Sequence, residues 1–304
     1  MNVIKEREKS SLLRGMEALH NRVELLPKDD SYYSSLKSGY EGEKIFDRKI
    51  MDAINNEAVY ISDLLLNING KSAQIDAILI TASCLYVFEV KNYYGEYKFS
   101  GVEFANLNGY VIVSPLDQLN RSLTILTQLL KQWNVQIPVD GKVVCINPSF
   151  TLFTKDPPEN IILPTQLDTF LKKMNSQSKP MTSSSRILGK RLLTMNQQEV
   201  PFQKQLPPYE YVQLRKGVKC PQCNNFNVVL TQRSCRCLTC KKQIAIQLAI
   251  LYAIDEYKLL YPRKKMTTRD LFYWMGGEVS KYKISNTLET HYKKVGRSKD
   301  RHYE

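Results

Sequence analysis

The sequence predicts an α/β protein with a mixed sheet flanked by helices, followed by a small cysteine-rich and helical C-terminal module. Apolar strand-like runs alternate with helical segments through the first 174 residues, which is typical of α/β folds. Five of the seven cysteines then lie between 220 and 240, where they indicate metal binding rather than disulfides. Residues 1–200 carry 23 Lys+Arg against 22 Asp+Glu, whereas residues 201–304 carry 20 against 8, so the excess positive charge lies in the last third.

This composition limits the classes of function. At 304 residues the chain has room for more than one domain. It has neither an 18-residue apolar run nor a signal-peptide pattern, so we expect a cytoplasmic protein that does not enter a membrane. The three histidines, at 20, 291 and 302, lie outside the carboxylate-bearing segment described below, which argues against a Ser-His-Asp or Cys-His enzyme. The basic last third favours an anionic polymer as partner, with a solvated basic surface as the alternative.

The first elements follow from local patterns. Residues 1–35 are expected to form a helical arm, with a helix near 3–20 and a polar loop that begins at Pro27 and ends at Ser38. A second helix covers about 40–55. Strands are expected near 58–67, 72–80, 84–91, 95–101 and 105–113. Asn69-Gly70 predicts a tight turn between the first two strands.

Further elements complete the predicted domain. Pro115 predicts a helix over 115–132, because Pro is tolerated in a first turn. Residues 141–147 indicate a buried strand, and a short helix runs from Thr165 to Met174. The chain then becomes polar, with a potential helix near 185–196. The expected parts are a helical arm (1–35), an α/β domain (36–174), a polar linker (175–216), a ribbon (217–243) and a helical module (244–304).

Charged residues on the predicted hairpin of 72–80 and 84–91 indicate a catalytic site. With a four-residue loop at 81–84, Ile80 faces Leu85, Asp76 faces Glu89 and Gln74 faces Lys91. Alternation then puts these four polar residues on one face, and Ile75, Phe88 and Val90 on the other. Directly opposed carboxylates repel each other across a sheet. The same two carboxylates are favourable when they bind Mg²⁺ between them. A lysine beside that metal ion can act on a water or a phosphate.

Two more segments join this hairpin. Glu43 closes the segment Gly39–Glu43 at the start of a helix and could reach the hairpin as a third acidic group. Gln118 and Arg121 lie on neighbouring positions of the later helix. Each of these residues also has an ordinary structural interpretation. Glu43 could simply lie near the start of a helix, where a carboxylate is favourable, and Gln118 could lie on a helix surface. Glu89 and Lys91 could form a surface ion pair.

The order and spacing of these motifs resemble the nuclease-related domain (NERD), a branch of the PD-(D/E)xK restriction-endonuclease-like superfamily. The resemblance covers roughly residues 36–150. It rests on the G-x-x-G-E opening, the Q-I-D strand, the E-V-K-N strand followed by Gly95, and the Pro…Gln helix. It implies a restriction-endonuclease-like mixed sheet flanked by helices.

The resemblance also implies roles for the hairpin residues. Asp76 and Glu89 would be ligands of Mg²⁺ or Mn²⁺, and Lys91 would be the catalytic lysine. Glu43 would assist the metal or the water, and Gln118 would lie at the edge of the site. Ala77 departs from the family pattern, where many relatives have His or another polar residue, but the acidic pair is intact.

The cysteines indicate zinc. Two C-x-x-C motifs, Cys220 to Cys223 and Cys237 to Cys240, provide four thiolates for a tetrahedral site, as in a zinc ribbon. Cys235 could replace one ligand or lie free beside the site. Free structural or redox cysteines are the alternative. A closed four-thiolate site is structural, so the ribbon is expected to present basic residues, namely Lys219, Arg233, Arg236, Lys241 and Lys242.

The C-terminal segment resembles a helix-turn-helix with a potential wing. Thr267 or Thr268 can cap a first helix, Gly276-Gly277 breaks it, and a second helix near 280–295 ends at Gly296. Ile284, Leu288 and Tyr292 would be core. Its exposed face would contact nucleic acid through Lys281, Lys283, Asn286, Thr287, His291 and Lys294. A small helical bundle with a solvated basic face is the alternative.

The resulting hypothesis is a divalent-metal-dependent nuclease that hydrolyses phosphodiester bonds, in DNA rather than RNA. The zinc ribbon and the helix-turn-helix module would target it to its substrate. Two alternatives stay open. The first is a non-catalytic DNA- or RNA-binding protein that uses an inactive nuclease-like scaffold, and the second is a zinc-dependent protein adaptor.

Overall fold

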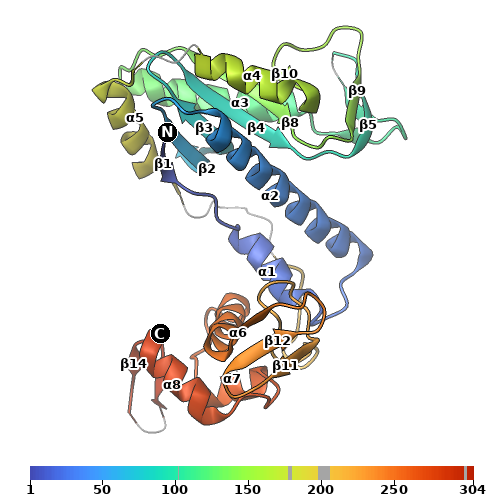
Figure 1. Cartoon of the computed structure of the whole chain (residues 1–304), viewed down its shortest axis with the longest axis vertical. Coiled ribbons are helices and arrows are strands. Elements are labelled where there is room, and N and C mark those ends of the chain that lie inside the picture. Colours follow the sequence, from blue (N-terminus) through green and yellow to red (C-terminus); the bar gives the residue numbers. More distant parts are fainter. Residues whose placement is uncertain (102, 177–179, 198–205, 298–299) are drawn as a thin grey trace. The chain divides into compact units, whose positions relative to one another are not determined.

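The computed structural model describes residues 1–101, 103–176, 180–197, 206–297 and 300–304 (Figure 1). The chain divides into two compact units. The first consists of Met1–Glu8 and Ser35–Gln203, and the second of Lys9–Ser34 and Lys204–Glu304. None of the helices within the described ranges combines the length and apolarity needed to span a bilayer.

The first unit is built on a six-stranded mixed sheet, ordered β1-β2-β3-β4-β8-β10. The strands are β1 (Asn2–Lys5), β2 (Val59–Ile68), β3 (Lys71–Ile80), β4 (Leu85–Lys91), β8 (Val139–Cys145) and β10 (Ile161–Ile162). β2, β3 and β4 pair antiparallel, whereas β1, β8 and β10 each pair parallel to a neighbour. The predicted mixed sheet is therefore confirmed.

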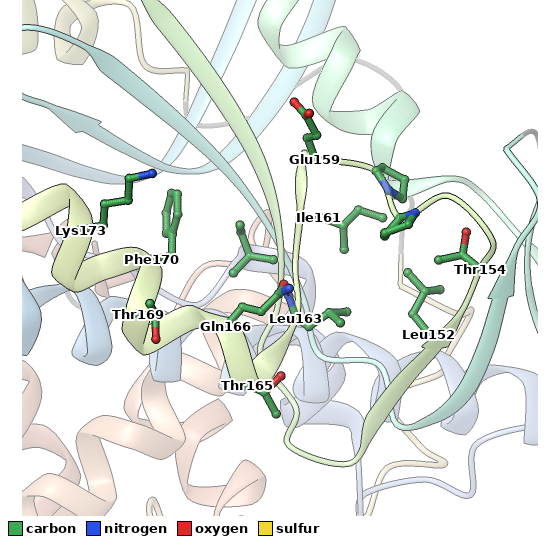
Figure 2. Close-up of a pocket in the computed structure, with 13 residues that line it drawn as sticks. Leu152, Thr154, Glu159, Ile161, Leu163, Thr165, Gln166, Thr169, Phe170 and Lys173 are labelled. Atoms are coloured by element: carbon green, nitrogen blue, oxygen red, sulfur yellow. The ribbon is translucent and has the colours of Figure 1, made fainter.

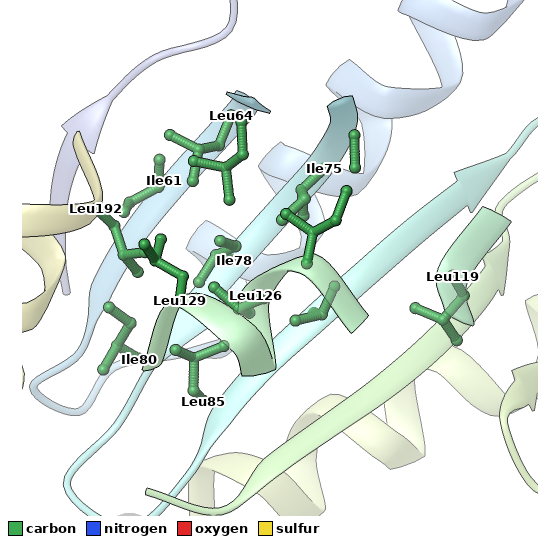
Figure 3. Packing of buried hydrophobic residues seen from close by; sticks show 14 of the residues in the cluster. Ile61, Leu64, Ile75, Ile78, Ile80, Leu85, Leu119, Leu126, Leu129 and Leu192 are labelled. Atoms are coloured by element: carbon green, nitrogen blue, oxygen red, sulfur yellow. The ribbon is translucent and has the colours of Figure 1, made fainter. Parts of the chain in front are cut away.

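Helices cover both faces of this sheet. α2 (Pro27–Ala53) and α4 (Pro164–Ser176) contribute Phe46 and Leu167 to an apolar cluster with Phe88. α3 (Pro115–Gln132) and α5 (Ser183–Thr194) contribute Leu126 and Leu192 to a second cluster, seen close up in Figure 3. Neighbouring residues of β3 point alternately into the two clusters, so the helix pairs lie on opposite faces.

A smaller sheet extends the unit in the order β7-β6-β5-β9. Its strands are β5 (Gly95–Phe99), β6 (Phe104–Asn106), β7 (Val111–Ile112) and β9 (Phe150–Phe153). The predicted strand over 105–113 is instead the hairpin of β6 and β7. Gly109 in its turn has a φ of 83°, a conformation that glycine adopts without strain.

The ladder of β2 and β3 has one irregular position. Asp63 and Asp76 do not pair, although the residues on either side of them do, in an unchanged register. Asp63 has a φ of 53°, in the left-handed region. The alternation of side chains shifts by one residue here, because Ile75 and Ile78 enter the same apolar cluster although they are three residues apart.

This shift corrects part of the predicted hairpin. Ile80 pairs with Leu85, as expected, and the β3–β4 ladder extends to the pair of Ala77 with Phe88. Ile75 does not share a face with Phe88 and Val90, which pack in the other cluster. Gln74 does not face Lys91 either. The β3–β4 ladder includes neither residue, and the Gln74 amide donates to Asp63 Oδ1 at 2.7 Å.

The N-terminal segment also differs from the prediction. Residues 2–5 form an edge strand beside β2 instead of the start of a helix, since their β-branched side chains suit a sheet. The expected polar loop from Pro27 to Ser38 is helical. Pro27 lies in the first turn of α2, and Asp29 and Asp30 interact favourably with the positive end of the helix dipole.

The predicted linker contains a helix that belongs to the first unit. α5 lies near the expected 185–196, but it packs on the sheet through Leu188 and Leu192. Gly189 allows this approach, because a Cβ atom there would lie 2.7 Å from Val59 Cγ1. Amphipathic packing on β2 therefore outweighs the polar composition of this stretch.

The second unit combines helices and small sheets. Its helices are α1 (Ser11–Leu19), α6 (Ile246–Leu260), α7 (Thr268–Trp274) and α8 (Lys281–His291). Its strands are β11 (Val228–Leu230), β12 (Ser234–Cys237), β13 (Gln243–Ala245), β14 (Lys294–Val295) and β15 (His302–Tyr303). Trp274 lies fully buried in the apolar cluster that joins these elements, and its indole N–H donates to Ala253 O.

A buried ionic network anchors α1 and the following loop inside this unit. Glu256 of α6 pairs with Arg22 at 2.6 Å and with Lys219 at 2.7 Å. Lys219 also donates to the carbonyl of Glu17, and Arg22 lies over the Trp274 ring at 3.9 Å. The expectation that the ribbon presents Lys219 to a partner is wrong, because this side chain is fully buried.

The packing of α5 predicts the sign of a substitution. Gly189→Ala should lower the free energy of unfolding by about 1–3 kcal/mol, because the stiff, buried Val59 cannot yield to the added methyl group. The control is Gly39→Ala in α2, where no atom lies within 4 Å of the added carbon. That change should stabilise by about 0.5–1 kcal/mol. Urea unfolding of both variants measures the difference, and a stabilising Gly189→Ala would contradict the packing of α5.

Candidate acidic site and metal centre

Four charged side chains lie around the irregular position of β3, where Asp76 interacts electrostatically with Glu43, Glu89 and Lys91. Glu43 comes from α2, Asp76 from the irregular position of β3, and Glu89 and Lys91 from β4. Asp76 and Glu89 are buried, and Glu43 and Lys91 are partly buried. The structure therefore brings together four of the five residues predicted as catalytic.

Each carboxylate is held by one fixed donor. Glu43 Oε2 accepts from Arg7 Nη1 at 2.6 Å, and Asp76 Oδ2 accepts from the backbone N–H of Val90 at 2.7 Å. Glu89 Oε1 pairs with Lys91 Nζ at 2.7 Å. The second oxygen of each carboxylate accepts no hydrogen bond from the described residues. Three oriented oxygens are thus left for a ligand.

The electrostatics of the cluster favour a cation. Burial and the neighbouring Asp76 raise the pKa of Glu43 to about 8, against the opposing effect of Arg7. Burial and Asp76 likewise raise the pKa of Glu89 to about 7. Burial also raises the pKa of Asp76. The carboxylates thus disfavour one another's charge, which a bound divalent cation would relieve.

At Lys91 the surroundings favour the charged form of the side chain. Burial alone would lower the pKa of its ammonium group, but Glu89 and Asp76 outweigh burial and raise it. Lys91 therefore stays protonated and positively charged at neutral pH. Such a group can stabilise negative charge on a bound phosphate, and it cannot accept a proton as a general base.

Arg7 is a member of the cluster that the sequence analysis did not identify. Its guanidinium is buried and contacts Glu43, Asp47 and the carbonyl of Asp76. Arg7 lies in a charged N-terminal segment that was expected to be helical, far along the chain from its partners. No local motif marked it, and only the parallel pairing of β1 with β2 brings it here.

Gln118 is the predicted catalytic residue that makes no polar contact with this cluster. It lies on α3, and its Oε1 is buried without a hydrogen-bond partner among the described residues. Ser122, one turn later, donates to the carbonyl of Gln74 at 3.4 Å, so this part of α3 lies against β3. Its role at the edge of the site stays a prediction.

Among the described residues, one set of three or more potential metal ligands lies close enough together to hold an ion. It consists of the four cysteines, whose sulfur atoms all lie within 4.8 Å of one another. Glu43, Asp76 and Glu89 do not form such a set. Mg²⁺ usually keeps several waters and takes only one or two protein carboxylates, so it does not require three of them to converge.

A separate pocket of about 700 Å³ lies beside α4 (Figure 2). Apolar residues such as Ile161, Leu163 and Phe170 line it, together with Glu159 and Lys173 at its rim. None of the predicted catalytic residues lines this pocket.

The cysteine cluster has the dimensions of a four-thiolate zinc site. Cys220 Sγ lies 3.7 Å from Cys240 Sγ, and Cys223 Sγ lies 3.5 Å from Cys237 Sγ. Four sulfurs at about 2.3 Å from a tetrahedral zinc ion would be about 3.8 Å apart. The donor set and its spacing therefore fit zinc.

The two cysteine turns repeat one backbone geometry. The N–H of Cys220 donates to Asn225 O and that of Cys237 to Lys242 O, both at 2.9 Å. Each turn ends on a residue in the left-handed region, Asn224 with a φ of 58° and Lys241 with a φ of 62°. Both turns are thus folded to direct their sulfurs inward.

Cys235 is not part of this set. It is buried in the apolar cluster of the second unit, so of the two roles left open for it the structure favours a thiol outside the metal site. The three-stranded sheet β11-β12-β13 connects the cysteine turns, as expected of a ribbon.

The C-terminal helices resemble the prediction with two differences, the end of α8 and the burial of Thr287. Thr267 caps α7 and Gly276-Gly277 follows it in the left-handed region, but α8 ends at His291, before Gly296. β14 and β15 then form an antiparallel pair where a wing was expected. Thr287 is buried and donates to Lys283 O, so the expectation that it is exposed is wrong.

The remaining predicted contact residues differ in accessibility. Four are exposed: Lys281, Asn286, His291 and Lys294. Lys283 is partly buried, and its ammonium donates to Gln232 O of the ribbon at 2.7 Å. Ile284 and Leu288 are fully buried, as predicted, and Tyr292 is partly buried.

A comparison with known families finds a match within the first unit. Residues 38–146 match the family model of the nuclease-related domain, which confirms the resemblance found in the sequence over this span. The match includes Glu43, Asp76, Glu89 and Lys91 and excludes Arg7 and the cysteine cluster. No curated protein and no solved structure matched the chain.

The cysteine geometry predicts distinct effects for neighbouring thiols. Cys237→Ser should abolish stoichiometric zinc binding and destabilise the second unit, because a structural zinc site needs all four ligands. Cys235→Ala should retain one zinc per chain, since its sulfur lies outside the set. Elemental analysis of the purified full-length variants measures this, and loss of zinc from Cys235→Ala would contradict the ligand assignment.

Proposed function

We propose that the protein is a divalent-metal-dependent nuclease of the PD-(D/E)xK type that hydrolyses phosphodiester bonds in DNA. The observation that carries the proposal is the cluster of Glu43, Asp76 and Glu89. Each has one oxygen held by the protein and one left free, beside the cationic Lys91. The match of residues 38–146 to the nuclease-related domain supports the same reaction class.

In this proposal Asp76 and Glu89 hold Mg²⁺ or Mn²⁺, and Glu43 assists the metal or the water. When bound, the cation supplies Lewis-acid stabilisation of the charge that develops on the scissile phosphate. Lys91 adds a second positive charge there. Its raised pKa favours this role over activation of water by proton abstraction.

The second unit would bind the substrate. Its exposed residues on α8 and at β14 include Lys281, Asn286, His291 and Lys294, and exposed Arg233, Arg236, Lys241 and Lys242 lie on the ribbon. Lysine and arginine contacts with phosphates position a protein on DNA, and they make its affinity depend on salt. The zinc ion would act here by folding the ribbon.

The hydrolytic role predicts loss of cleavage from isosteric changes. Asp76→Asn and Lys91→Met should each reduce metal-dependent cleavage about 100-fold or more, because each removes a charge that faces the phosphate or its metal. The measurement uses linear, circular and single-stranded DNA with Mg²⁺ or Mn²⁺, which also identifies the substrate form.

A matched control lies on the neighbouring strand. Lys142 of β8 pairs with Asp140 at 3.0 Å, two residues apart like Lys91 and Glu89, and is similarly buried. Lys142→Met should leave cleavage within about twofold of wild type, because Lys142 pairs with Asp140 and with none of the three carboxylates of the site. DNA binding without cleavage under every metal condition would contradict the proposal and favour a non-catalytic binding protein.

The binding role predicts a change in salt dependence. Lys281→Ala should weaken DNA binding and reduce the slope of log affinity against log salt by about one, the effect of losing one phosphate contact. Lys49→Ala is the control with the same charge change, because Lys49 pairs with Asp168 in the first unit. Equal slopes for all three proteins would contradict the assignment of α8 as a contact surface.

A further inference from the structure

Arg7 makes four hydrogen bonds around the acidic site. Nη1 donates to Glu43 Oε2 at 2.6 Å, and Nη2 donates to the carbonyl oxygen of Asp76 at 2.6 Å. Nε and Nη2 also form a bidentate pair with Asp47 at 2.8 and 3.0 Å. The side chain is only 2% exposed. One guanidinium thus links α2 to the irregular position of β3.

The charge of Arg7 is already balanced by Asp47. Both oxygens of that carboxylate accept from Arg7, and Tyr60 OH donates to Asp47 Oδ1 at 2.6 Å. The bonds to Glu43 and to the Asp76 carbonyl are additional to this pair. Because the planar guanidinium offers its donors in a rigid fork, these bonds also fix the direction and distance of the two groups.

We propose that Arg7 is a positioning residue of the acidic site, which holds Glu43 and the β3 backbone at Asp76 in place for a divalent cation. This inference rests on the proposed function. Arg7 binds only Glu43 Oε2 and leaves Oε1 free, and it binds the carbonyl of Asp76 and leaves the carboxylate free. It orients potential ligands without occupying them.

The inference extends the site beyond the family match. Arg7 lies 31 positions before residue 38, where the match begins, and it reaches the site because β1 pairs with β2. Lys5 in the same segment donates to Ser62 O and Asp63 O, so this segment contacts both strands at the irregular position, β2 through Lys5 and β3 through Arg7. The N-terminal strand then has a functional role besides covering a sheet edge.

The test measures Mn²⁺ binding to the full-length, zinc-loaded protein by calorimetry, alongside DNA cleavage at varied Mn²⁺. Asp76→Asn identifies the heat that belongs to the acidic site. Arg7→Lys keeps the charge and loses the fork, and Arg7→Gln loses both. We expect Mn²⁺ affinity to fall about 10-fold or more in each, as is usual when a partner that orients a metal ligand is removed.

Two comparisons separate positioning from folding. Tyr60→Phe removes a hydrogen bond of Asp47 but leaves the Arg7–Glu43 contact, so it should lower the melting temperature without changing Mn²⁺ affinity. In a Glu43→Gln background, the loss of affinity caused by Arg7→Lys should be smaller than in wild type, because residues that act through one another are not additive.

The outcomes distinguish the inference from the proposed function. If the wild type binds no Mn²⁺ beyond that seen with Asp76→Asn, both are overturned. If the wild type binds Mn²⁺ and cleaves DNA but Arg7→Lys binds it equally well, only the inference is overturned. An equal loss in the wild-type and Glu43→Gln backgrounds also overturns it, because Arg7 would then not act through Glu43.

Discussion

The first unit places three largely buried carboxylates around the irregular position of its large sheet. Asp76 raises the pKa of both Glu43 and Glu89, and the low-dielectric surroundings increase the cost of ionising them together. Two elements supply compensating groups: the segment after β1 provides Arg7, and β4 provides the N–H of Val90 and Lys91. Stability alone does not favour such an arrangement, which supports the proposed function, because that function uses the charge.

Much of this unit could be predicted from local patterns. Helix 115–132 and the strands around Asp76 and Glu89 were identified because periodicity and turn residues agree there. The face of Ile75 could not be predicted, because alternation rules assume a regular ladder. Asp63 and Asp76 interrupt it in a way that depends on contacts with Lys5, Arg7 and Val90.

The missed features share a cause, which is that tertiary contacts decide them. Residues 2–5 form a strand only because the edge of β2 is available, and α5 is part of a core only because β2 offers Val59 to Gly189. The two C-x-x-C motifs, by contrast, could be predicted, because each one folds into a turn through contacts with its own sequence neighbours. Lys219, next to Cys220, was misjudged because its buried partner Glu256 lies 37 residues away in the sequence.

Both units are assembled from non-contiguous segments, since the chain enters each of them twice. A fragment limited to the family-matched residues 38–146 would lack β1, β10 and α5. It would expose the edges of β2 and β8 together with the apolar side chains that α5 covers. Unpaired, hydrophobic sheet edges promote intermolecular pairing, so a fragment limited to the family match would be prone to aggregate. Soluble expression therefore depends on residues that a family alignment would trim away.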